Sequence, residues 1–247
     1  MPLNQSLLSS CSIGSEQSHC FDRLTADELD FLQQHQTDLH YKKGEMILKQ
    51  GTYVSNVMFL VEGLVKIFVE GPQENLILKI IAPGNLIAVS SAFEGNQVYQ
   101  YSAQAYVDSV VRAIDIQVFR QLLKQNAAFA AEVVNVLSMN SIQIYGRFYC
   151  LVRKQSYGKL ADVLLCISDR VFKNPRFDMD LTRKEIGELS GMSTENVIRI
   201  LKSFAEEGLI RIKGKSFEIL DAERSVAEVT DRLFSLIEAH TGLALAR

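Results

Sequence analysis

The sequence has little of what marks disordered, fibrous or membrane-spanning chains. Its 247 residues include only four prolines and fourteen glycines. Hydrophobic residues make up 47% of the chain and charged residues 22%, a globular composition that excludes a disordered tail protein, a collagen-like fibre and a low-complexity linker. No uninterrupted apolar run approaches the ~18 residues of a membrane span, so we expect no membrane partner.

Cysteines are few and scattered. Cys11, Cys20, Cys150 and Cys166 form no C-x-x-C pair, and in a reducing compartment such cysteines are expected to be free thiols. Residues 1–12 lack the basic start and the apolar stretch of a secretory signal. We therefore expect a cytoplasmic protein.

Histidines are also scarce, and none occurs between Tyr41 and Ala239. A metal-dependent enzyme of the cupin type would need clustered imidazole and carboxylate ligands on its strands. The sequence also lacks a nucleophile–base constellation and a Walker-type glycine loop. We therefore predict neither an enzyme nor a metal site.

The net charge of −3 is unevenly distributed. Lys and Arg number 9 against 14 Asp and Glu in residues 1–146, 14 against 10 in residues 147–220, and 3 against 5 in residues 221–247. A basic segment between two acidic ones can hold a nucleic-acid surface within an acidic total. A chance excess is the alternative interpretation.

The first part of the chain changes from a helical to a β pattern. Residues 22–38 are predicted to form a short amphipathic helix that Thr25 caps. From Tyr41 to Phe119, short β-rich runs alternate with Gly or Pro at intervals of about ten residues, which is typical of an antiparallel sandwich or barrel.

Helical patterns follow. Residues 126–153 contain no proline and one glycine, which predicts a long helix. Further amphipathic helices are predicted over residues 156–172 and 221–240, the last either packing on its own domain or adding a dimer contact. In the long helix a heptad-like seam favours dimerisation over packing on its own domain. The residues of this seam follow one another at alternating spacings of three and four: Val134, Leu137, Ser141, Ile144, Phe148 and Leu151.

Residues 181–220 have the signals of a helix-turn-helix with a β-wing. Thr182 and Glu185 predict a capping box at the start of one helix. Gly191 supplies a turn residue that can adopt a positive φ, and Ser193 caps a second helix. The inward positions of that helix are predicted to be Val197, Ile200, Leu201 and Phe204.

The outward face of the second helix suits the major groove of DNA. Arg199 can donate two hydrogen bonds to a guanine edge, and Glu195 can accept one from a cytosine amine. Hydroxyl and ammonium groups nearby can bond phosphates. The alternative is a structural helix with a Glu195–Arg199 surface ion pair. The predicted DNA-binding residues are Thr182, Ser193, Thr194, Glu195, Asn196, Arg199, Lys202, Lys213 and Lys215, the last two on the wing.

This order of elements resembles the CRP/FNR family of bacterial transcription regulators. The most specific stretch, LTRKEIGELSGMSTENVIRILKSFAEEGLI, is similar to the family's DNA-binding signature. GEMILKQG, FLVEGLVKIF and IAPGNLIAV look like its cyclic-nucleotide-binding-type β-roll. The resemblance implies an α+β fold with a jelly-roll-like effector domain over residues 1–125, a dimerisation helix over 126–153, and a winged helix-turn-helix domain over 154–247.

The resemblance also implies a sequence-specific regulator. A homodimer is expected to bind a palindromic promoter site, and RNA polymerase is a further expected partner. The family's reading pair matches Glu195 and Arg199, which implies TGA-like half-sites. The additional arginine of the cAMP-responsive branch is Thr194 here, so the outer base preference is open.

An effector is implied as well, but the residues that would bind a cyclic nucleotide are missing. In the family a G-E-L segment and a following R-[ST] hold the ribose and the phosphate. Residues 88–90 (Ala-Val-Ser) and 98–100 (Val-Tyr-Gln) stand in their places, and the charge-assisted bonds are lost. The expected effector is therefore a small molecule other than cAMP, unless these residues simply fill the roll. Its predicted surroundings are Leu86, Ala88, Val89, Ser90, Tyr99, Tyr101 and Tyr145.

No cofactor is expected. An iron–sulfur cluster needs converging thiolates, and Cys11 and Cys20 lack close companions. Haem would have to use a cysteine or one of the histidines His19, His35 and His40. A haem- or redox-responsive regulator, and a ligand sensor that acts through protein partners, stay open as alternatives.

Overall fold

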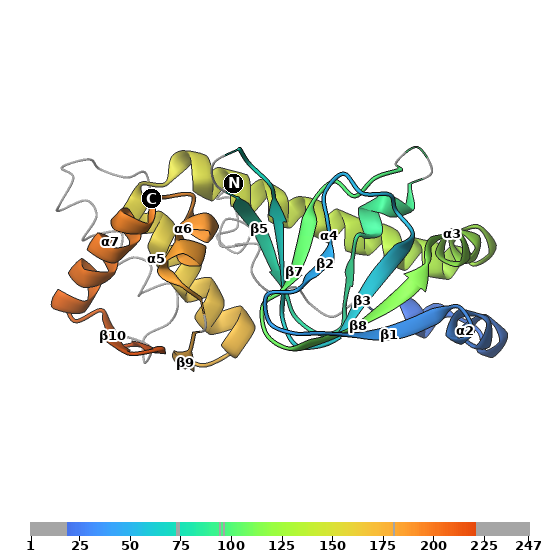
Figure 1. Ribbon diagram of the computed structural model, residues 1–247, viewed down its shortest axis with the longest axis horizontal. Coiled ribbons are helices and arrows are strands. Elements are labelled where there is room, and N and C mark those ends of the chain that lie inside the picture. Colours follow the sequence, from blue (N-terminus) through green and yellow to red (C-terminus); the bar gives the residue numbers. More distant parts are fainter. Residues whose placement is uncertain (1–18, 73–74, 94, 96, 180, 221–247) are drawn as a thin grey trace, which may run out of the picture. The chain divides into compact units, whose positions relative to one another are not determined.

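The structure is a computed structural model, and it describes residues 19–220 apart from residues 73–74, 94, 96 and 180. The chain divides after Tyr145 into two compact units, which we call the N-terminal unit and the C-terminal unit (Figure 1). Cys11 and the C-terminal helix predicted over residues 221–240 lie outside the described residues.

The N-terminal unit begins with a 3-10 turn, η1 (Cys20–Arg23), and the helix α2 (Ala26–Gln33). Thr25 and Glu28 form a capping box at the start of α2, which confirms the predicted cap. The prediction that this helix continues to residue 38 is wrong, because β1 (Gln36–Tyr41) pairs along its whole length with a strand about 70 residues away. The backbone hydrogen bonds of that distant pairing outweigh a weak local helix pattern.

The strands form two four-stranded antiparallel sheets. The order in the first sheet is β1, β8 (Ser109–Asp115), β3 (Asn56–Glu62) and β6 (Asn85–Ile87). The order in the second is β2 (Met46–Leu48), β7 (Ser102–Ala105), β4 (Val65–Val69) and β5 (Leu76–Ile81). The β-rich run over residues 86–91 leaves the extended conformation after Ile87, since Ala88 has a φ of 63° and a 3-10 turn, η2 (Val89–Ala92), follows.

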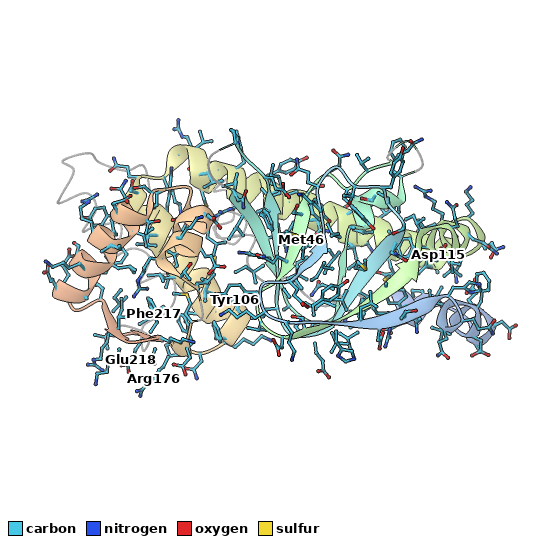
Figure 2. All side chains as sticks on the ribbon, viewed as in Figure 1. Met46, Tyr106, Asp115, Arg176, Phe217 and Glu218 are labelled. Atoms are coloured by element: carbon cyan, nitrogen blue, oxygen red, sulfur yellow. The ribbon has the colours of Figure 1, made fainter. Side chains whose placement is uncertain are left out.

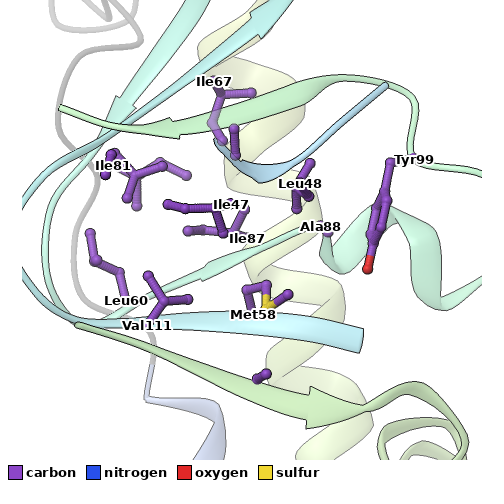
Figure 3. Close-up of a cluster of buried hydrophobic side chains, with 14 residues drawn as sticks. Ile47, Leu48, Met58, Leu60, Ile67, Ile81, Ile87, Ala88, Tyr99 and Val111 are labelled. Atoms are coloured by element: carbon purple, nitrogen blue, oxygen red, sulfur yellow. The ribbon is translucent and has the colours of Figure 1, made fainter. Parts of the chain in front are cut away.

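A buried apolar cluster lies between the two sheets. It takes Ile47, Ile67 and Ile81 from the second sheet and Met58 and Leu60 from the first, and Figure 3 shows their side chains converging. Period-two alternation along each strand directs these side chains inward. We call this cluster the roll core.

A second cluster joins the first sheet to helices. The helix α3 (Ile116–Gln125) is capped by Asp115 (Figure 2) and buries Phe119 and Leu122. In Figure 1, α2 and α3 lie side by side beyond one end of the strands. The long helix α4 (Ala127–Arg153) adds Phe129 and Val133 to this cluster.

The start of α4 is fixed by one asparagine. The Asn126 side-chain oxygen accepts from the backbone N–H of Phe129 at 2.9 Å, which satisfies an unpaired donor of the first helical turn. Its side-chain nitrogen donates to the Glu28 carboxylate at 2.7 Å and to the Arg23 carbonyl at 3.0 Å. The long helix is therefore anchored to α2 and η1.

The described part of the C-terminal unit contains three further helices and a small sheet. The helix α5 (Ser156–Cys166) continues as a π-helical turn, η3 (Ile167–Phe172). After it come α6 (Arg183–Ser190) and α7 (Thr194–Glu206). The sheet order is β10 (Ile210–Lys213), β11 (Ser216–Ile219) and β9 (Arg176–Asp178). The predicted fold class, a β-roll followed by a long helix and a winged helix-turn-helix, is confirmed.

One face of α4 is exposed and apolar. The helix α4 is long and apolar enough to cross a bilayer by length and composition alone, and most of it is exposed. Its sequence contains no uninterrupted apolar run of such a length. Four exposed apolar residues and two serines of α4 repeat at alternating spacings of four and three, as in a coiled-coil seam. We call this set the α4 stripe: Val134, Ser138, Ser141, Tyr145, Phe148 and Val152.

Candidate nucleic-acid interface

The interface begins with the close crossing of α6 and the turn that follows it. Gly191 ends α6 with a φ of 62°, a conformation that glycine adopts without strain. A Cβ on Gly187 would lie 2.6 Å from the carbonyl oxygen of Met192. Only a glycine leaves room for this approach, which sets the angle between α6 and α7.

Both helices of the motif have the caps that the sequence predicts. The Thr182 hydroxyl accepts from the backbone N–H of Glu185 at 3.1 Å, and the Glu185 carboxylate accepts from the Thr182 N–H at 3.0 Å. The Ser193 hydroxyl accepts from the Asn196 N–H at 3.4 Å. Two of the predicted DNA-binding residues, Thr182 and Ser193, thus fix the starts of α6 and α7.

The helix α7 has one buried and one exposed face. Its buried residues are Val197, Ile200, Leu201 and Phe204, which are the predicted inward positions. Thr194 and Asn196 are half-buried at its start. The exposed residues Glu195, Ile198, Arg199 and Lys202 share the other side, because residues three and four apart are neighbours on a helix.

The Arg199 side chain is held by residues other than Glu195. Its Nη1 donates to the Tyr157 hydroxyl at 3.4 Å, and its guanidinium carbon lies 5.7 Å from the centre of the Tyr157 ring. Its Nη2 lies 3.5 Å from the Asn196 side-chain oxygen. Among the described residues no ion pair joins Arg199 to Glu195. The Glu195–Arg199 ion pair of the alternative interpretation is therefore not formed, and both side chains are accessible to other partners.

Sequence reasoning missed Tyr157. It lies in the first turn of α5, and its ring packs edge-on against Phe204 at 5.8 Å between ring centres. Tyr157 and Arg199 are 42 positions apart, so no local spacing could reveal the contact. Tyr157 stands on the core side of α7 and supports the guanidinium at its edge.

The wing carries the two predicted lysines at its tip. Lys213 pairs with Ser216 across the hairpin, and Gly214 has a φ of 59° in the turn between them. Lys213 and Lys215 are exposed. Figure 2 shows Phe217, Glu218 and Arg176 grouped on the small sheet that supports this turn.

The predicted surroundings of the effector are mostly core. Leu86 and Val89 belong to the cluster with α3 and α4, whereas Ala88 and Tyr99 belong to the roll core. Tyr101 packs against the roll core. Ser90 is exposed, and Tyr145 is 70% exposed on the α4 stripe. Ala88 and Ser90 both hydrogen-bond to Tyr101, so part of the predicted set is grouped around that tyrosine.

Two tyrosine hydroxyls in this region are already engaged. The Tyr99 hydroxyl donates to the Asn56 carbonyl at 2.9 Å and lies 3.2 Å from the Asn56 nitrogen. The Tyr101 hydroxyl accepts from the Ala88 N–H at 2.8 Å, and burial raises the pKa of Tyr101.

The predicted seam of α4 is only partly exposed. Val134, Ser141, Ile144 and Phe148 face solvent. Leu137 instead packs against the cluster of its own unit. Leu151 lies against Gly191, so close that a Cβ there would be 2.9 Å from its Cδ2.

Cofactor ligands do not gather in the part of the chain that the structure describes. No group of three or more His, Cys, Asp and Glu side chains there could hold a metal ion. Cys20, Cys150 and Cys166 are buried. His35 Nδ1 donates to the Phe31 carbonyl oxygen at 2.8 Å, and His19 and His40 are exposed.

A β-roll that precedes a capped helix-turn-helix and a basic wing defines a DNA-binding protein with a sensor-type domain. Two family models match this chain: a cyclic nucleotide-binding domain over residues 38–126 and a Crp-like helix-turn-helix domain over residues 158–224. The chain belongs to the CRP/FNR family, and it is a DNA-binding transcription regulator, not an enzyme.

Relatives and solved structures agree with this assignment. The transcriptional activator protein anr of Pseudomonas aeruginosa is 26% identical over 222 residues, which cover 83% of this chain and 90% of that protein. A CRP-like cAMP-activated global transcriptional regulator of Mycobacterium tuberculosis is 28% identical over 192 residues, or 74% of this chain and 84% of that protein. The structure of FixK2 from Bradyrhizobium japonicum shares the fold, with a TM-score of 0.70 and 19% identity over 86% of this chain and 99% of that one.

The Tyr157 contact generates a prediction about base reading. Replacing Tyr157 with Leu should weaken binding to a TGA-containing duplex by about 0.5–1 kcal/mol, because Arg199 loses a cation–π partner. Tyr157→Phe, which keeps the ring, should lose less. Fluorescence anisotropy measures both, and thermal unfolding checks that the Phe204 packing survives.

Proposed function

We propose that the protein acts as a homodimer that binds a palindromic promoter site with TGA-like half-sites and responds to a small-molecule effector other than cAMP. The observation that carries the DNA-binding part is the exposed pair Glu195 and Arg199 on α7. Neither side chain neutralises the other, so both are available for base edges.

The α7 face supplies contacts for such a half-site. Arg199 can bond a guanine bidentately, Glu195 can accept from the amine of a cytosine, and the 52% exposed Ile198 can contact a thymine methyl. Phosphate contacts would come from Ser193, Thr194, Asn196, Lys202, Lys213 and Lys215. The N–H groups at the start of α7 favour a phosphate there as well.

Dimerisation through α4 is supported by its exposed stripe. Val134, Tyr145, Phe148 and Val152 are each more than half exposed, an arrangement that is costly in water over several helical turns. A second copy of α4, packed knobs-into-holes, would cover them. The two-fold axis of such a dimer matches a palindromic site.

The effector is proposed to differ from cAMP because the charged groups that would hold a cyclic phosphate are replaced. Residues 98–100 stand in the place of the arginine and its neighbour, and the Tyr99 hydroxyl among them is engaged by Asn56. Residues 88–90 stand in the place of the Gly-Glu-Leu segment, and Val89 among them is buried. The Mycobacterium relative is named as cAMP-activated; the Pseudomonas relative is named only as a transcriptional activator. We place the protein in the cytoplasm, with RNA polymerase as a partner, as for regulators of this family.

Base reading by Arg199 leads to a sharp prediction. Arg199→Ala should weaken binding to a duplex with two TGA half-sites by ~1–3 kcal/mol and should relax the preference at one base pair. Arg199→Lys, which keeps the charge but not the bidentate geometry, should relax the preference with a smaller loss of affinity. Competition binding against duplexes changed at each half-site position measures both effects. An equal loss on scrambled DNA would contradict base reading.

The dimer is tested on the α4 stripe. The double variant Val134→Asp/Phe148→Asp should weaken self-association roughly hundredfold or more, since each apolar side chain that it removes from the interface contributes about 1.5–3 kcal/mol when buried. Met139→Asp is the matched control, an exposed apolar residue of α4 outside the stripe. Sedimentation equilibrium measures the association constant. A wild-type monomer, or an equal effect of the control, would rule out this interface.

A further inference from the structure

A lysine lies on the inner face of the β-roll. Lys79 of β5 pairs directly with Ile67 of β4, and Ile81 pairs with Val65. Directly paired residues and residues two apart share one face of a sheet. Val65, Ile67 and Ile81 all belong to the roll core, so Lys79 extends from the same face as these buried apolar side chains. Figure 3 shows Ile67 and Ile81 on this face.

The partner of Lys79 is an amide on α4. The Lys79 ammonium donates to the Asn140 side-chain oxygen at 2.7 Å. The residues one and two turns before Asn140 on this face, Val136 and Val133, pack in the apolar cluster with α3. The inner face of α4 thus changes from apolar to polar where it meets Lys79.

The next residue on that polar face is unsatisfied. Gln143 lies one turn beyond Asn140, and residues three apart on a helix are neighbours. Gln143 is only 7% exposed, and its side-chain oxygen is buried without a hydrogen-bond partner. A buried acceptor without a donor is costly. This oxygen would be satisfied by a donor that the described chain does not supply.

The charge of Lys79 is also uncompensated among the described residues. Burial lowers its pKa to about 8 and is the only cause of the shift, so the ammonium still carries its proton at neutral pH. Its hydrogen-bond partner Asn140 and its cross-strand partner Ile67 are both uncharged. A desolvated cation that meets only neutral groups is unfavourable, and an apolar side chain at this position would cost less.

We propose that Lys79, Asn140 and Gln143 recognise an anionic small-molecule effector, which carries a carboxylate or phosphate for the Lys79 ammonium and a hydrogen-bond donor for the Gln143 oxygen. The inference rests on the proposed effector control. In this proposal Lys79 of β5 supplies the cation in place of the arginine that the family has in its β-roll. Because the group joins β5 to α4, ligand binding there acts directly on the helix that carries the α4 stripe.

The first test follows the titration of Lys79 in the full-length protein by NMR of labelled lysine side chains, with the signal assigned from Lys79→Met. The probes are inorganic phosphate and succinate, each against chloride at matched ionic strength. An anion binds the protonated amine preferentially, so a probe that binds should raise the midpoint from about 8 toward 10.5. Phosphate and succinate distinguish the two sources of negative charge. A midpoint that neither probe moves overturns the proposal.

Variants separate this site from the basic DNA-binding surface. Asn140→Asp places a carboxylate beside Lys79, and it should raise the midpoint without any probe and abolish the probe response. A probe that binds the folded protein should also raise its Tm. Lys79→Met should lose this rise, whereas the control Lys66→Met, on the opposite face of the same sheet, should keep it. Equal probe responses in wild type and Lys79→Met would contradict the assignment.

DNA binding is measured in parallel, because neither Lys79 nor Asn140 is placed at the DNA interface. Lys79→Met should keep its affinity for a TGA-containing duplex in the absence of probe. If wild type binds the duplex but Lys79 does not respond to either probe, this inference alone fails. If Lys79 responds but wild type shows no sequence-specific DNA binding, the proposed function fails and the anion site stands.

Discussion

The close packing of α6 against the turn at Met192 is the constraint on which the reading surface depends. Position 187 has no space for a side chain, because a Cβ on Gly187 would lie 2.6 Å from the Met192 carbonyl oxygen. The angle between α6 and α7 then decides which α7 residues are buried and which are presented. A second contact supports it: the buried Arg147 near the end of α4 donates to the Leu189 carbonyl in the last turn of α6, where unpaired carbonyls and the helix dipole favour a cation. The position of α6 is thereby tied to the long helix.

The long helix combines several tasks on separate faces. Its first inner turns are apolar and pack against α3. Its middle inner turns are polar, where Asn140 bonds Lys79 and Gln143 is buried. Its outer face is the exposed α4 stripe. In our account a ligand at Lys79 would therefore act on the helix that we propose pairs the two subunits.

Local signals explain why much of the fold could be predicted from sequence. The capping boxes at Thr25 and Thr182 need only residues three apart, and the turn at Gly191 needs one residue with a positive φ. Strand pairing needs distant partners. For that reason residues 36–38, whose partners lie in β8, were assigned to a helix. Side-chain chemistry indicates base contacts for Glu195 and Arg199, and family resemblance adds the TGA-like half-site.

The α4 seam shows that periodicity alone does not determine which residues of a helix are exposed. The predicted seam and the α4 stripe share Val134, Ser141 and Phe148 and differ in the residues between them. Hydrophobicity favours Leu137 and Leu151, but each of these packs within its own unit. The contacts of Tyr157 with Arg199 and of Lys79 with Asn140 join residues 42 and 61 positions apart. Such contacts follow from tertiary packing and leave no trace in local spacing.

The central claim is that two copies of α7 read a two-fold symmetric DNA site. Selection of bound duplexes from a random pool by the full-length protein tests it most directly. We expect enrichment of a palindrome with TGA-like half-sites whose centres lie about one helical turn (10–10.5 base pairs), or a multiple of it, apart. Enrichment of a single asymmetric site, or no enrichment over the starting pool, would contradict it.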